Sequence, residues 1–220
     1  TEFNKILKFN LKGKLVKSWK FPGENDSWHI NSICHFKGRI LFSAFCDLKK
    51  TRAYKKDSKK IGFVQDLSSG EKIIKGLSQP HSLVAHEEDL LLADSEDLSI
   101  KVFDRNYKLK RNVHIGQYTR GILVNNDAIY IGLSASRNKA FAGAIDSAKI
   151  LALDTESFKP ISSINLRCKE IYDIQKINDT ENLIEVIATL SDVQSKNYRS
   201  SKDEISLLVK ENDVLTKEKD

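Results

Sequence analysis

Residues 76–95 read Gly76-Leu77-Ser78-Gln79-Pro80-His81-Ser82-Leu83-Val84-Ala85-His86-Glu87-Glu88-Asp89-Leu90-Leu91-Leu92-Ala93-Asp94-Ser95. This pattern is typical of a turn, a short strand with a polar start, a tight turn and a second, apolar strand. Similar openings recur at His29, Arg120 and Tyr172, at spacings of 52, 39 and 52 residues. A four-stranded propeller blade takes about 40–50 residues. The sequence therefore predicts an all-β fold, a β-propeller of four-stranded blades.

The number of expected strands does not fill a whole number of blades. An alternating hairpin spans residues 5–21, and blades are expected from residues 29, 81, 120 and 170. The ring is then either five-bladed with a two-stranded first blade, or an incomplete segment of a six-bladed ring. We expect residues 1–220 to form a single propeller domain, which lacks N-terminal blades in the second case. Another chain or a missing segment would then complete the ring, because open sheet edges need pairing or covering.

Composition limits the setting of the protein. No apolar run reaches the roughly 18 residues of a membrane span, and the N-terminus has no secretory signal. Cys34, Cys46 and Cys168 form no Cys-x-x-Cys pair, so we expect reduced thiols and a cytoplasmic location. The net charge of +6 is concentrated in a basic loop insertion at residues 47–60, interpreted as a solvated loop or as a phosphate-binding arm. Nucleic acid is a disfavoured partner, because aromatic residues are too few for a stacking platform.

Polar residues at the start of each blade are the candidate site. In a propeller the first strand of each blade lines the central channel, so these residues meet at the channel mouth although they lie far apart in sequence. His29 and His81 are candidates for acid/base roles and Arg120 for stabilising negative charge, if the protein is an enzyme. The expected ligand-binding residues are Trp28, Asn31, Ser82, Ser134, Arg137, Glu170, Tyr172 and Asp173.

Each of these residues also has a structural interpretation. The imidazoles suit hydrogen bonds between blades, and Arg120 and Arg137 suit ion pairs with Glu170 and Asp173. A divalent cation held by His29, His81, Glu170 and Asp173 is a further option, although ligands on separate blades leave no spacing signature. The sequence therefore does not identify a cofactor.

Several short motifs together resemble a bacterial β-propeller family of unknown function. They are Trp28-His29-Ile30-Asn31, Gly76-Leu77-Ser78-Gln79-Pro80-His81-Ser82, Thr119-Arg120-Gly121, Gly132-Leu133-Ser134-Ala135-Ser136-Arg137 and Glu170-Ile171-Tyr172-Asp173. The resemblance covers about residues 25–180 and implies a six-bladed cytoplasmic propeller with no established activity. The present sequence departs from that pattern by lacking about one or two early blades.

Two functional hypotheses follow from these residues. The first is a module that binds a polar ligand, anionic or carbohydrate-like, or a protein partner at the channel mouth. The second is a lyase or hydrolase acting on a sugar-like substrate with histidine acid/base chemistry. Propellers serve both classes, so the fold does not choose between them.

Overall fold

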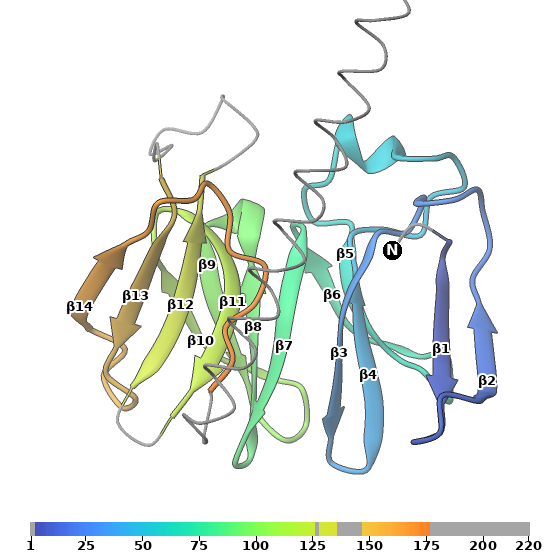
Figure 1. Cartoon of the computed structure of the whole chain (residues 1–220), viewed down its shortest axis with the longest axis horizontal. Helices are drawn as coiled ribbons and strands as arrows, with labels where there is room; N and C mark the ends of the chain where they lie inside the picture. The colour runs from blue at the N-terminus through green and yellow to red at the C-terminus, as the bar shows by residue number, and fades with distance from the viewer. Residues whose placement is uncertain (1–2, 126–127, 136–146, 177–220) are drawn as a thin grey trace, which may run out of the picture. The chain divides into compact units, whose positions relative to one another are not determined.

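The computed structural model describes residues 3–125, 128–135 and 147–176, and its regular structure there is almost entirely β-strand (Figure 1). Residues Thr1–Gln175 form one compact unit. The chain begins with a hairpin of β1 (Lys5–Phe9) and β2 (Leu15–Lys20), as the alternating pattern of residues 5–21 predicts. None of the three cysteines forms a disulfide. Within the described ranges, no helix is long and apolar enough to cross a membrane.

Three four-stranded antiparallel sheets follow the hairpin, and we call them the first, second and third blades. The first blade contains β3 (Ile30–Phe36), β4 (Arg39–Ala44), β5 (Gly62–Asp66) and β6 (Lys72–Leu77). The second contains β7 (Pro80–His86), β8 (Asp89–Asp94), β9 (Ser99–Phe103) and β10 (Leu109–His114). The third contains β11 (Tyr118–Val124), β12 (Ile129–Ser134), β13 (Lys149–Leu153) and β14 (Pro160–Asn165).

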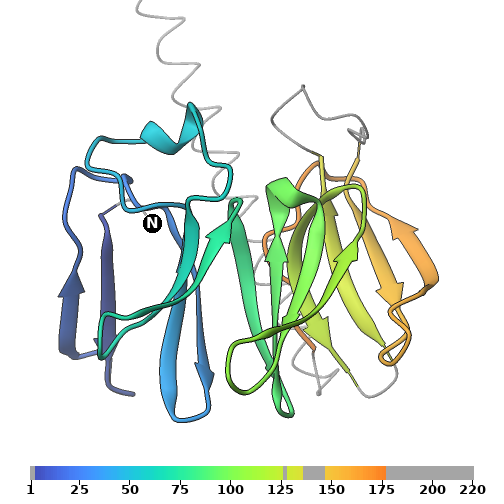
Figure 2. The same cartoon turned by 180° about the vertical axis from the view of Figure 1, so that it is seen from behind.

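The first strands of the blades lie next to one another. β7 packs against β3 on one side and β11 on the other, and the two views in Figures 1 and 2 show these strands together at the centre. This succession of four-stranded blades confirms the propeller architecture. The sheets of the described residues do not close into a ring, which fits an incomplete propeller.

The hydrophobic core is divided among the gaps between neighbouring sheets. The run Leu90-Leu91-Leu92 in β8 illustrates the reason, because Leu90 and Leu92 pack toward the first blade and Leu91 toward the third. Successive side chains of a strand point to opposite faces, so a sheet covered on both sides needs a continuous apolar run. A third cluster, around Trp28 and Phe42, lies between the hairpin and the first blade.

Each inner strand contains an irregularity near its start. The pairing register shifts around Asn31 in β3, Ser82 in β7 and Gly121 in β11. By this register, Ile30 is the equivalent of His81, whereas the sequence repeat pairs His81 with His29. His29 instead lies one residue before β3, in a left-handed conformation with φ of 51°.

Side-chain hydrogen bonds join the inner strands. The backbone N–H of Leu83 donates to Ser32 Oγ at 3.1 Å, and that of Gly121 donates to Ser82 Oγ at 3.0 Å. The segment in which a fourth blade is expected to begin contacts the third blade, where the backbone N–H of Ile171 donates to Ser134 Oγ at 3.0 Å. No strand is formed between residues 166 and 176. The strands expected within residues 182–190 and 204–217, and Arg137, lie outside the described residues.

Candidate functional site

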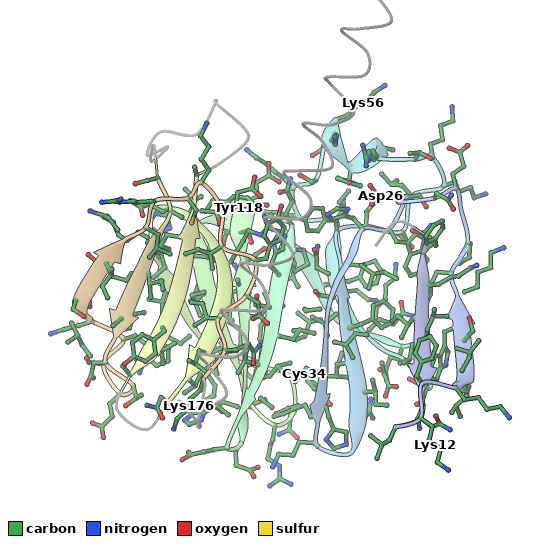
Figure 3. All side chains as sticks on the ribbon, viewed as in Figure 1. Lys12, Asp26, Cys34, Lys56, Tyr118 and Lys176 are labelled. Carbon is green, nitrogen blue, oxygen red and sulfur yellow. The ribbon has the colours of Figure 1, made fainter. Side chains whose placement is uncertain are left out.

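The candidate site lies at the channel mouth, the end at which β3, β7 and β11 begin. Figure 3 labels Asp26, Tyr118 and Lys56 at this end, and Lys12 and Cys34 at the opposite end. Two turns reach the same end: residues 22–29, and the basic loop of residues 47–60 with its short 3-10 turn η1 (Ala53–Lys55). Groups from three blades therefore meet here.

His29 is held by a carboxylate three residues earlier. Its Nδ1 lies 2.6 Å from Asp26 Oδ1 and 2.9 Å from the hydroxyl of Tyr54, which in turn lies 3.2 Å from Asp26 Oδ2. Burial tends to raise the pKa of Asp26, but hydrogen bonds from His29 and Arg52 outweigh it and lower that pKa. An ionised carboxylate only accepts, so Nδ1 of His29 carries a proton and donates it. Nε2 is then the basic nitrogen whenever the ring is neutral.

His81 has the same tautomer for a different reason. Its Nδ1 lies 3.0 Å from the backbone oxygen of Gln79 and 2.7 Å from Ser95 Oγ. The Ser95 hydroxyl donates to the backbone oxygen of Thr119 at 2.5 Å, so its oxygen accepts from His81. The side chain is buried, with 6% exposure, and burial together with the charge of Arg120 lowers the pKa of His81 well below its ordinary value. His81 is therefore neutral near pH 7, with Nδ1 protonated.

Burial also lowers the pKa of His29, although Asp26 opposes the shift and Arg120 adds to it. Both imidazoles therefore keep an Nε2 lone pair near neutral pH. Among the described residues, neither Nε2 atom has a hydrogen-bond partner. The mouth thus offers two acceptors that can receive a hydroxyl proton or a hydrogen bond.

The two imidazoles belong to one cluster of stacked and edge-on rings. Phe45 lies between them, with ring centroids 4.4 Å from His29 and 5.1 Å from His81. Tyr54 contacts His29 at 4.8 Å, and Tyr118 contacts His81 at 5.9 Å. Burial raises the pKa of both tyrosines, so their hydroxyls stay protonated at neutral pH. Packing of this kind fixes ring orientations across three blades.

Arg120 brings the positive charge of the site. Its side chain is 14% exposed, Nη1 lies 3.4 Å from Glu170 Oε2, and the guanidinium lies 4.2 Å from the ring centre of Tyr172. Its Nε is buried without a hydrogen-bond partner among the described residues, as is Oε1 of Gln117 three residues earlier. The expected pairing of Arg120 with Glu170 is present, but at 3.4 Å it is long. A guanidinium with unused donors suits a carboxylate or phosphate.

The basic loop is fastened to the mouth. Arg52 Nε donates to Asp26 Oδ2 at 2.7 Å, and the backbone N–H of Thr51 donates to Glu24 Oε2 at 2.9 Å. Farther along, Gln79 Nε2 donates to Ser58 Oγ at 2.7 Å, while Gln79 Oε1 accepts from the hydroxyl of Tyr118 at 2.6 Å. Gln79 therefore links the loop to the second and third blades.

The remaining residues expected in the site have varied positions. Trp28 is buried in the core against Phe21 and Phe63, and its Nε1 has no partner among the described residues. Asn31 Nδ2 donates to the backbone oxygen of His29 at 3.2 Å. Ser82 joins β7 to β11 as described above. The structure thus places Trp28 in packing and Ser82 in backbone hydrogen bonding.

The C-terminal members of the expected set differ in exposure. Ser134 is buried and bonded to Ile171. Glu170 and Tyr172 lie beside Arg120, with Tyr172 63% exposed. Asp173 is exposed and accepts from the backbone N–H of Ile174 at 2.9 Å. The described residues contain no group of three or more His, Cys, Asp or Glu side chains placed to hold a metal ion, so the optional cation site of His29, His81, Glu170 and Asp173 is not assembled.

A pocket of about 250 Å³ lies away from this site. It opens between the second and third blades and is lined by residues including Asp89, Lys110, Arg111 and Phe158. Its cationic groups have partners: Lys110 pairs with Asp89 at 2.6 Å, and Arg111 Nη1 donates to the backbone oxygen of Glu156 at 2.8 Å. None of the residues expected in the site lines it.

Sequence reasoning missed six residues of the mouth: Asp26, Phe45, Tyr54, Gln79, Ser95 and Tyr118. Asp26 carried a usable signal, because a carboxylate three residues before a histidine in a turn is a common partner for the ring. Tyr118, two residues before Arg120, also had one, since alternate residues of a strand share a face. Tyr54 had none, because it lies within a run of charges that is typical of solvated loops.

A family model, Domain of unknown function (DUF4915), matches residues 1–187, so the chain belongs to that family. This agrees with the resemblance to a family of unknown function, while the assignment of individual motifs stays a prediction. No curated protein matches.

Three solved structures are similar to this chain. Glutaminyl cyclase of Myxococcus xanthus is 9% identical with a TM-score of 0.46, over 72% of this chain and 61% of that one. BamB from Moraxella catarrhalis is 12% identical with a TM-score of 0.46, over 80% of this chain and 47% of that one. The dihydro-heme d1 dehydrogenase NirN, in complex with DHE, is 9% identical with a TM-score of 0.43, over 74% of this chain and 33% of that one.

Proposed function

We propose that this member of the DUF4915 family binds a small hydroxylated carboxylate, of the kind found in sugar acids, at the channel mouth. One observation carries the proposal: a mostly buried guanidinium, that of Arg120, acts electrostatically on two neutral imidazoles whose Nε2 atoms have no partner among the described residues. Such a set pairs one charged donor group with two acceptors.

The guanidinium would hold the carboxylate. A bidentate pair of N–H···O bonds between Arg and carboxylate is stronger and more directional than a single contact. Arg120 has donors available for it, because its contact with Glu170 is long, at 3.4 Å, and uses Nη1 alone among the five N–H donors of a guanidinium.

The imidazoles would receive ligand hydroxyls. Both carry their proton on Nδ1, so each Nε2 can accept a hydrogen bond from an O–H group. Asp26 and Ser95 hold the two rings in that tautomer. A neutral polyol would satisfy only the imidazoles, and a simple carboxylate only the guanidinium, so a hydroxylated anion fits best.

Calorimetric titration with glucuronate and galacturonate tests the proposal, with glucose and galactose as the uncharged controls. We expect the acids to bind and the neutral sugars to bind at least about tenfold more weakly, since a charge-assisted hydrogen bond contributes about 1.5–3 kcal/mol. Arg120→Lys keeps the charge but removes the planar fork, and should weaken binding of the acids by about the same factor.

Arg39→Lys is the matched control, because Arg39 lies at the β3–β4 turn and contacts Asp66 and Glu71 rather than the mouth. Its binding should equal that of the wild type. Equal affinity for acid and neutral sugar, or unchanged binding in Arg120→Lys, would contradict the proposal.

A second function is favoured by the Asp26–His29 pair. A neutral imidazole oriented by a carboxylate through Nδ1 is the arrangement of a general base that acts through Nε2. A lyase acting on a uronide chain would use His29 to take the C5 proton next to the carboxylate, while Arg120 stabilises the negative charge that develops. The electron pair of the C5–H bond then forms the C4=C5 double bond as the C4–O bond breaks, and the leaving sugar oxygen takes a proton from water. Release of an unsaturated product from oligogalacturonates, measured by absorbance and lost in His29→Gln, is the expected sign of that activity. If oligogalacturonates bind but are not cleaved, only the binding function remains supported.

A further inference from the structure

Six lysines of the basic loop form an exposed positive surface beside the channel mouth. We call Lys49, Lys50, Lys55, Lys56, Lys59 and Lys60 the basic loop surface; all six are exposed. In the described part of the chain, none of the six makes an ion pair. Figure 3 labels Lys56 at the end of the molecule that also carries Asp26 and Tyr118.

The acidic groups around this surface are bonded to other partners. Glu24 accepts the backbone N–H of Thr51, and Asp57 accepts that of Lys59. Asp26 pairs with Arg52 and His29. Glu96 accepts the hydroxyl of Ser58. These carboxylates keep their charge, but among the described residues none of them forms an ion pair with the six lysines, which outnumber the two acidic residues of the loop, Asp47 and Asp57, so the loop is net positive.

The loop presents these lysines from a defined backbone. Tyr54 is buried against Phe45 and Cys46, and the backbone N–H of Lys60 donates to Ser78 Oγ at 3.0 Å. With the bonds of Thr51, Arg52 and Ser58, the loop is attached at intervals along its length. A fixed scaffold reduces the ordering cost that a partner would otherwise incur on binding.

We propose that the basic loop surface binds the chain of an acidic polysaccharide while one uronate residue of that chain occupies the channel mouth. This rests on the proposed function and extends it from a single sugar acid to a polymer. Six separated charges cover more area than a monosaccharide can reach, whereas a polyanion places a carboxylate on each successive residue. Release of counterions from such a chain favours binding and makes it dependent on salt.

Two other polyanionic partners fit the surface less well. Single-stranded nucleic acid binds through exposed aromatic rings, and the one aromatic residue of the loop, Tyr54, is buried. A membrane surface is usually bound through lysines together with apolar side chains that enter the lipid. The apolar residues that flank the loop, Leu48 and Ile61, are only 37% and 38% exposed.

The test compares hexagalacturonate with monomeric galacturonate on the full chain. In the loop variant, the six lysines of the basic loop surface are changed to Gln. In the control variant, the six exposed lysines of the N-terminal hairpin are changed to Gln: Lys5, Lys8, Lys12, Lys14, Lys17 and Lys20. Both variants lose the same net charge. Calorimetric affinities are measured at several salt concentrations, and circular dichroism checks that each variant is folded.

We expect the loop variant to bind the hexamer at least about tenfold more weakly and with a shallower salt dependence, because each exposed contact contributes modestly and the contacts add. Its affinity for the monomer should be unchanged, and the control variant should match the wild type for both ligands. Equal losses in the two variants would overturn the proposal in favour of net charge alone. Tighter loop-dependent binding to a DNA oligonucleotide or to anionic vesicles would also overturn it.

The two proposals fail in different ways. If the monomer does not bind the wild type at all, the proposed function is wrong. If the monomer binds through Arg120 but the hexamer binds no more tightly, and the loop variant changes neither affinity, only the polysaccharide inference is wrong.

Discussion

Nδ1 of His29 lies 2.6 Å from one carboxylate oxygen of Asp26, and the other oxygen of Asp26 accepts from Nε of Arg52 at 2.7 Å. A single carboxylate therefore orients an imidazole of the channel mouth and fastens the basic loop. Site and loop are coupled through this side chain.

Asp26→Asn should weaken both the hydrogen bond that orients His29 and the attachment of the basic loop. The neutral amide cannot pair with Arg52, and one of its two terminal atoms becomes a donor, so we expect a loss of about 2 kcal/mol in the free energy of unfolding. Trypsin should cut within residues 49–60 faster than in the wild type, because the loop is released. Asp57→Asn is the control, since Asp57 is exposed and accepts only the N–H of Lys59 among the described residues. Unchanged proteolysis in Asp26→Asn would contradict the coupling.

Stability should fall as the pH drops below about 6.5, because His81 stays neutral in the fold while the unfolded chain takes up a proton. The pKa of His81 is lowered by burial and by Arg120, so its contribution is complete above the unfolded pKa and is lost as the pH falls toward the folded pKa. The expected slope is about 1.4 kcal/mol per pH unit. Urea unfolding between pH 7 and pH 5 measures it. His81→Gln should reduce the slope and leave the contribution of His29, whose pKa is also lowered, and His86→Gln, at the far end of β7, should keep the wild-type slope.

Ser82→Ala should weaken the contact between the second and third blades. It removes the acceptor of the Gly121 N–H, and a lost hydrogen bond of this kind costs about 1 kcal/mol. Ser163→Ala in β14 is the matched control, since Ser163 is exposed and its hydroxyl has no hydrogen bond among the described residues. Denaturant midpoints of the two variants compare the effects, and equal midpoints would count against a role for Ser82 between blades.

Gly132→Ala should be among the most damaging single-methyl changes. A Cβ at this position would lie 2.1 Å from the backbone oxygen of Arg120 and 2.7 Å from Ile171, so β11 and β12 would have to separate. We expect a loss of about 3 kcal/mol, together with weaker ligand binding because Arg120 moves. At Gly38, by contrast, an added Cβ meets nothing within 4 Å, and its alanine variant incurs only the strain of a positive φ, about 1 kcal/mol. Thermal unfolding of both variants checks the difference.

The sequence predicted the strands well because their signal is local. Alternation in residues 5–21 and the apolar run Leu90-Leu91-Leu92 follow directly from which face of a sheet is covered. In the first blade, the alignment of the sequence repeat was wrong by one residue. The repeat pairs His29 with His81, whereas the register shifts around Asn31 and Ser82 show that Ile30 is the equivalent of His81. An irregularity of one residue in strand pairing leaves no mark on composition.

The candidate site was only partly predictable for a different reason. His29 and His81 both contact Phe45, and the charge of Arg120 lowers the pKa of both imidazoles, so the three side chains lie in one region of the structure. The residues that determine their protonation, Asp26 and Ser95, act through contacts that only the folded chain creates. The charge of the basic loop predicts a solvated loop, and its lysines are indeed exposed. Its backbone, however, is anchored by Thr51, Arg52 and Ser58, which lie within the same charged stretch.

The hydroxyls of Ser32 and Ser82 each accept a backbone N–H from the following blade. These bonds fix how far one inner strand is shifted along its axis relative to the next. The hydroxyls that make them belong to other residues than those that carry the ring nitrogens and the guanidinium, so the alignment of the blades does not depend on the groups proposed to bind the ligand. Substitution of His29, His81 or Arg120 can therefore alter ligand specificity while the packing of the inner strands is retained.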